Sequence, residues 1–182
     1  MATSSSNVRV AVTGKVYVGP TTSDAPTSSS SVVDTDFVEV GYIGDAGITE
    51  SRSRTSTDIK AWQNGDNVRT IVTEGKLTFK FPLLETNATA LQTFYGATVA
   101  GATSTDGRLD IVPTATGGRK SYIFDVADGA EAQRTYVAEG EVTEVGDVVY
   151  TSGGAVLREV TVTAYPVAGV TAKVWSTALK TA

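Results

Sequence analysis

The amino-acid sequence predicts a mainly β fold, a sandwich or barrel-like arrangement of strands with a single short helix. The segment 76–81 (KLTFKF) alternates polar and apolar residues, which is the two-residue period of a half-buried strand. Glycine-containing turns, such as the Asp-Gly pair at 128–129, separate several stretches of this kind. Only residues 88–95 repeat apolar side chains at three- and four-residue steps, the spacing of a helix face.

The first part of the chain predicts strands that are separated by polar segments. Residues 1–7 are a polar N-terminal arm, and the alternating valines of residues 8–18 predict one or two strands. Residues 19–31 are rich in proline, serine and threonine and predict a loop. Residues 37–43 predict the next strand. We expect the polar stretch 44–68 to be a long loop.

The long loop leads into the strand–helix unit at the centre of the chain. A small apolar group at 59–62 (IKAW) precedes an Asn-Gly-Asp turn, and residues 68–73 enter a strand. Pro82 ends the following strand because proline has no N–H to donate. The helix is expected near residues 87–95, with Thr86 or Asn87 as its N-terminal cap and a glycine closing its C-terminus.

The second half of the chain predicts four more strands within the same domain, which spans residues 1–182. Residues 109–112 form a short strand, and residues 121–127 form a longer one with alternating apolar positions. Residues 132–145 and 156–165 predict two long strands, and Pro166 ends the last of them. Residues 167–182 are expected to form a C-terminal arm.

The composition gives no support to an enzyme. The chain has no histidine and no cysteine, so the usual general base, thiol nucleophile and zinc ligands are missing. The glutamates at 139, 141 and 144 are more typical of a solvated strand face than of an active site. The Gly-Gly-Arg-Lys sequence at 117–120 lacks the spacing of a phosphate-binding loop and predicts a turn. We therefore expect no catalytic residue, cofactor or metal site.

Membrane insertion and nucleic-acid binding are also disfavoured. No run of roughly 18 apolar residues is present, and the N-terminus lacks the basic and apolar regions of a signal peptide. The net charge of −5 makes the chain a poor ligand for phosphate backbones.

Four motifs between residues 41 and 96 follow one another in a distinctive order. They are GYIGDAGITES (41–51), IKAWQNGDNVRT (59–70), TEGKLTFKFPLLETN (73–87) and FYG (94–96). In order and spacing they resemble the major tail proteins, or tail tube proteins, of phages with long non-contractile (siphovirus-type) tails. The resemblance covers residues 16–96 well and the strand-rich remainder more loosely.

This resemblance implies two packed antiparallel sheets flanked by one helix, and a structural role. The family forms stacked, hexameric rings that build the tail tube, the conduit for double-stranded DNA delivery into the host. The implied partners are other copies of the chain, the tape measure protein, and the tail terminator and distal tail proteins, while DNA passes without specific binding. The implied location is the virion tail, after synthesis and assembly in the host cytoplasm.

The expected loop 44–68 is the leading candidate for contacts between subunits or rings. Arg52, Arg54 and Lys60 are expected to pair with acidic patches, and Trp62 to fill a pocket on a neighbour. Trp175 is a further interface candidate on the C-terminal arm. The alternative is an ordinary surface loop without a role.

The polar faces of the two long late strands are the candidates for the wall of the channel. An acidic or hydroxyl-rich wall repels or ignores phosphates, which suits the passage of DNA. The candidates are Glu139, Glu141, Glu159, Thr161 and Thr163. Two alternatives remain open: these side chains face outer solvent, or the channel is lined by a rival set, Lys76, Thr78 and Lys80, which its positive charge disfavours.

A different function class also fits a β-rich chain of this size. A monomeric β-sandwich binding module of a phage or bacterial surface would recognise a sugar or a protein. Such a module predicts a monomer with a pocket lined by aromatic side chains, whereas a tail tube protein predicts polymers.

Overall fold

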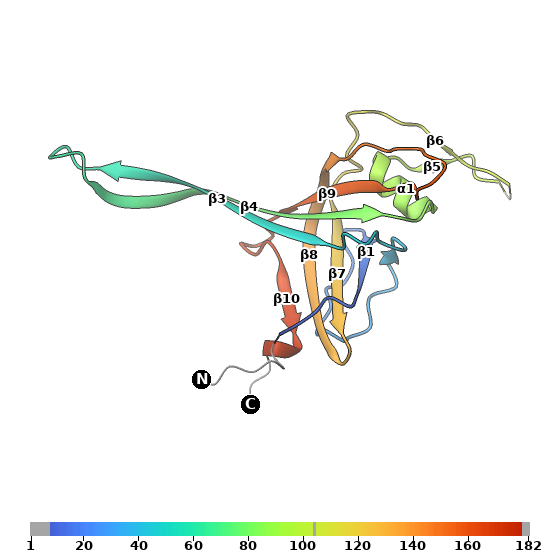
Figure 1. Cartoon of the computed structure of the whole chain (residues 1–182), viewed down its shortest axis with the longest axis horizontal. Helices are drawn as coiled ribbons and strands as arrows, with labels where there is room; N and C mark the ends of the chain where they lie inside the picture. Colours follow the sequence, from blue (N-terminus) through green and yellow to red (C-terminus); the bar gives the residue numbers. More distant parts are fainter. Residues whose placement is uncertain (1–7, 104, 180–182) are drawn as a thin grey trace.

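The structure is a computed structural model that describes residues 8–103 and 105–179, and most of its strands join one antiparallel sheet (Figure 1). The order across the sheet is β2 (Val38–Glu39), β1 (Thr13–Gly19), β7 (Lys120–Asp128), β8 (Glu131–Val145), β9 (Arg158–Tyr165), β4 (Asn67–Leu83) and β3 (Thr49–Lys60), with β10 (Lys173–Ser176) also paired to β8. The remaining elements are the helix α1 (Ala88–Tyr95), the two-stranded sheet of β5 (Val99–Ala100) and β6 (Arg108–Leu109), and a 3-10 turn at Thr177–Leu179.

The sheet folds back on itself into two layers. Strands β4 and β7 are separated in the sheet by β8 and β9, yet the ring of Phe79 on β4 stacks on the ring of Phe124 on β7, with 4.3 Å between centroids. Strand β8 belongs to both layers, since it pairs with β7 over its first part and with β9 over its last part. A register shift between Val142 and Glu144 interrupts the ladder that β8 forms with β9. The mainly β prediction with one helix is confirmed, but the two expected sheets are halves of one continuous sheet.

The core lies between these layers and is built from alternate residues of the strands. Phe81 of β4, Val137 of β8 and Val160 of β9 are all fully buried. Lys80, next to Phe81, is exposed, whereas Tyr136, next to Val137, is buried in a second cluster with Phe37 and Ile123 on the other side of the sheet. Burial of each such side chain contributes about 1.5–3 kcal/mol relative to exposure, so this alternation is the main source of stability.

Helix α1 covers one end of the layers and forms where the sequence predicts it. The side-chain oxygen of Asn87 accepts a hydrogen bond from the backbone N–H of Ala90 at 2.8 Å, which identifies Asn87 as the cap. Gly96 ends the helix with a φ of +62°, a conformation that favours glycine. The Asn87 side chain also donates to the carbonyl of Val40, so the cap ties the helix to the segment after β2.

The expected long loop at 44–68 is wrong, because most of it belongs to a β-hairpin. Strands β3 and β4 pair from Thr49 opposite Lys80 to Lys60 opposite Asn67, with register shifts after Thr55 and after Ile59. Asn64 and Gly65 both have positive φ at the turn, as tight hairpin turns require. The segment looks like a loop in sequence because neither of its faces is buried, so the apolar alternation that marks other strands is missing.

The C-terminal residues are attached to the body of the same molecule. In the described part of the expected C-terminal arm, β10 pairs with β8, with Trp175 opposite Arg134. The expected N-terminal arm at 1–7 and residues 180–182 lie outside the described residues. Among the described residues, no helix is long and apolar enough to cross a bilayer.

Candidate assembly surfaces

The distal part of the β3–β4 hairpin extends beyond the two-layered body (Figure 1). Strand β4 pairs with β9 only over Leu77–Leu83. Among the described residues, no strand outside the hairpin pairs with residues 53–76, which we call the arm. Every arm residue except Ala61 is exposed. From Leu77 to Asn67 the strand rises ~3.4 Å per residue, so the arm reaches about 34 Å from the body.

The arm exposes apolar side chains on both of its faces. The β3–β4 register puts Ile59 and Ile71 on one face, 45% and 39% exposed, and Val72 on the other, 59% exposed. Val68, at the register shift near the tip, is 62% exposed. Trp62, at the tip, is 99% exposed. An isolated two-stranded hairpin is marginally stable in water, and exposed apolar clusters mark interaction sites. The arm is therefore an element that lacks a partner within its own subunit.

Most of the interface residues that the sequence predicts lie on this hairpin. Arg54, Lys60 and Trp62 lie on the arm, and neither Arg54 nor Lys60 has a side-chain ion pair within the described chain. Arg52 lies at the base of the arm, where its Nε contacts Glu50 Oε1 at 2.9 Å. Their pairing with acidic groups of another molecule stays a prediction.

Trp175 lies elsewhere and has contacts inside its own subunit. On β10 it is half-buried against a small cluster that contains Phe37, Ile123 and Tyr136. Part of its surface therefore packs within the subunit, and its role in an interface stays a prediction.

The candidate channel residues share one outer face of the layer formed by β8, β9, β4 and β3. In an antiparallel sheet, directly paired residues lie on the same face. Thr163 pairs with Glu141 on one side and with Thr78 on the other, and Thr161 pairs with Lys80. The two sets that the sequence presents as rivals are therefore one surface. We call it the open face, and it consists of Thr49, Ser51, Lys76, Thr78, Lys80, Glu139, Glu141, Glu144, Glu159, Thr161 and Thr163.

Ion pairs on or beside the open face neutralise several of its charges. The Nζ of Lys80 lies 2.8 Å from Glu159 Oε1. Arg119, beside the face, contacts Glu139 and lies over the ring of Tyr165, 4.3 Å from its centroid. The hydrogen bond to Glu139 raises the pKa of the Arg119 guanidinium.

Of the three remaining candidates on this face, Thr161 lies between Lys80 and Glu144 in the sheet, and the other two have hydrogen-bond partners within the subunit. Thr116 donates a hydrogen bond to Glu141, and Thr163 is only 6% exposed and shares a hydrogen bond with Thr143. Thr163 is therefore mostly covered by its neighbours within the subunit.

The described residues contain no cluster of three or more acidic side chains that could hold a metal ion. Their candidate functional features are two surfaces, the arm and the open face. Sequence reasoning missed the strand character of the arm and the shared face of the lysines and glutamates. The Asn-Gly pair at 64–65 was the available signal for the first, since this dipeptide marks tight hairpins.

Comparison with known proteins points to one family. A family model described as phage tail tube protein matches residues 1–179. Among proteins with curated descriptions, none matches the chain.

Three solved structures are similar at low identity. A tube–sheath complex of an extracellular contractile injection system (PVC, extended state) is 10% identical over 96% of this chain and 99% of its own, with a TM-score of 0.48. The tail of an empty GTA particle with C6 symmetry is 12% identical over 84% and 91%, with a TM-score of 0.45. An Hcp protein is 11% identical over 90% and 98%, with a TM-score of 0.30. Identities and TM-scores this low do not establish relationship, so the family model carries the assignment.

Proposed function

The chain belongs to the phage tail tube protein family, and we propose that its copies join through their arms into the stacked rings of a tail tube. As a member of this family it is a structural component of the virion tail and not an enzyme. Each subunit would be complete only in the polymer, where neighbours cover the surfaces that it leaves exposed.

The observation that carries this proposal is the unpartnered arm. Trp62 is 99% exposed in the isolated subunit. Covering an aromatic side chain removes about 150–250 Å² from water, which is worth about 4–6 kcal/mol. The exposed apolar residues of the two arm strands add to this favourable term, which is offset in part by the entropy lost on association.

The layer with the open face has the dimensions of a tube wall. It offers four strands per subunit. A hexameric ring would join about 24 strands at ~4.8 Å spacing into a barrel about 37 Å across, or about 48 Å with a strand tilt of ~40°. Side chains of roughly 5 Å on each side leave a bore of about 27–38 Å. Duplex DNA, roughly 20 Å across, would pass through it.

The charges of the open face suit passage rather than binding. Its two lysines, Lys76 and Lys80, stand among four glutamates, and Lys80 is paired with Glu159. Unpaired cations would add salt-dependent affinity for phosphates, whereas a mixed, hydroxyl-bearing and net acidic face would not hold the DNA. We therefore propose Glu139, Glu141, Glu159, Thr161 and Thr163 as wall residues, together with the lysines.

The finer features of the proposal follow from the motifs at residues 41–96. We propose a long, non-contractile tail, assembled in the host cytoplasm, with the tape measure protein inside the tube and the terminator and distal tail proteins at its ends. Electron microscopy of the virions tests this, because a contractile sheath around the tube would contradict it.

Removal of the arm tests the assembly role directly. Joining Ser53 to Lys76, which are paired in the ladder, through Asn-Gly would replace residues 54–75 by a tight turn. We expect a folded monomer with an unchanged melting temperature, since the arm does not contribute to the core, and no tubes in negative-stain images at concentrations where the unmodified chain forms them.

The matched control shortens a different exposed segment. Replacing residues 151–155, which lie between β8 and β9 outside the arm, by a shorter glycine-serine linker keeps the arm intact and is expected to preserve tubes. Normal tubes from the armless variant would contradict the proposal. If the unmodified chain stays monomeric at every concentration, the alternative function, a surface binding module, would be favoured instead.

A further inference from the structure

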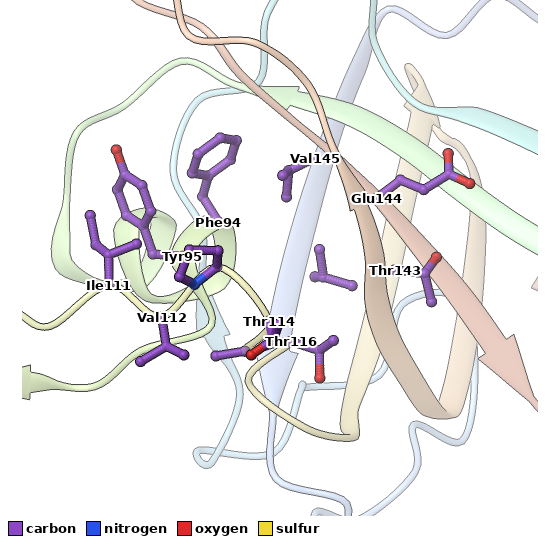
Figure 2. A pocket seen from close by; sticks show the side chains of 12 residues that line it. Phe94, Tyr95, Ile111, Val112, Thr114, Thr116, Thr143, Glu144 and Val145 are labelled. Atoms are coloured by element: carbon purple, nitrogen blue, oxygen red, sulfur yellow. The ribbon is translucent and has the colours of Figure 1, made fainter.

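A second exposed apolar feature lies between helix α1 and the end of β8. Here a cavity of about 320 Å³ is lined by Phe94 and Tyr95 of α1, by the 111–116 segment, and by Val142 and Val145 of β8. Figure 2 shows Phe94 and Val145 on either side of this space. We call it the helix groove.

The rim of the helix groove is apolar and uncovered in the isolated subunit. Ile111, Val112 and Val145 are 56%, 54% and 53% exposed, whereas Phe94 and Val142 form a buried floor. A concave apolar site with an exposed rim is the usual form of a receptor for one large side chain.

The arm and the helix groove lie at opposite ends of the molecule. In Figure 1 the hairpin extends away from the body on one side, and α1 with β5 and β6 lies on the other. An arm therefore cannot fold into the groove of its own subunit. Two different surfaces at opposite ends form a head-to-tail contact, which repeats from copy to copy instead of closing a dimer.

The chemistry of the two surfaces is complementary. The arm tip presents Trp62, the residue type most enriched among interface anchors, and the groove offers an apolar space for one aromatic side chain. Glu144 also borders the cavity, but its carboxylate is directed away from Phe94 (Figure 2) and belongs to the open face, so the contact would be apolar.

We propose that the helix groove is the receptor for the arm of a second copy, with Trp62 inserted between α1 and the 111–116 segment. This inference rests on the proposed tube assembly and adds the surface on which the arm docks. It makes each subunit a donor at one end and a receptor at the other.

Disulfide trapping tests the contact, since the chain has no cysteine of its own. Gln63→Cys places a thiol beside Trp62, and Thr114→Cys places one in the groove lining. Oxidised tubes of the double variant should run as a ladder of covalent multimers on a denaturing gel. Gln63→Cys alone should give dimers at most, and Gln63→Cys with Ala130→Cys, on the exposed β7–β8 turn, should give no ladder.

The outcomes separate this inference from the proposed function. Tubes that form normally but give no ladder with Gln63→Cys and Thr114→Cys would overturn the docking site and leave the tube subunit intact. Failure of the unmodified chain to form any tube would overturn both proposals.

Discussion

Replacement of Phe124 by alanine is expected to destabilise the subunit strongly without touching its assembly surfaces. Phe124 is 3% exposed on β7. Its ring stacks on Phe79 at 4.3 Å and meets Phe81 edge-on at 5.8 Å, both on the opposite layer. The side chain therefore joins the two halves of the folded sheet.

The magnitude follows from this burial. Removing a buried phenylalanine side chain costs about 3–5 kcal/mol, because the lost transfer energy adds to the cavity left behind. In a domain of this size each kcal/mol shifts the melting temperature by about 2–4 °C. Phe124→Ala should therefore lower the melting temperature by about 6–20 °C.

Trp62→Ala is the matched comparison, because it removes a larger aromatic side chain that is 99% exposed. Its effect on the monomer should stay within about 0.5 kcal/mol, while the concentration needed for assembly should rise about thirtyfold. Thermal unfolding followed by circular dichroism below the assembly concentration measures the first quantity, and sedimentation of tubes measures the second. A fall of less than about 3 °C for Phe124→Ala would refute the role of this aromatic contact between layers.

Two further changes test local features of the fold. Asp125→Asn should lower the free energy of unfolding by about 3 kcal/mol, because it leaves the buried Arg134 guanidinium without its charged partner. The same change at the exposed Asp110 should have little effect, and equal melting temperatures for the two variants would contradict this. Gly96→Ala should lower the free energy of unfolding by about 1–3 kcal/mol, because φ is +62° and a Cβ would lie 2.5 Å from the carbonyl oxygen of Ala115. An unchanged free energy of unfolding in urea would contradict this.

Residue types alone predicted parts of the candidate site. Trp62 and Lys60 stood out as an exposed anchor and a cation in a polar segment, and they lie on the arm. The strand character of that segment was not readable, because its alternation carries no buried face. The grouping of Lys80 with Glu159 depends on pairing between strands that lie far apart in the sequence, which no local pattern contains.

The sequence by itself determined the features that short-range physics controls. The helix at 88–95 follows from its apolar spacing, its Asn87 cap and its closing glycine, and the β class follows from alternating side chains. Only the tertiary structure decided how the strands fold into two layers, that residues 53–76 leave the body as an arm, and that the helix groove lies at the other end. The physical reason is that these features arise from contacts between distant segments, whose pairing depends on the whole sheet rather than on any one stretch of the chain.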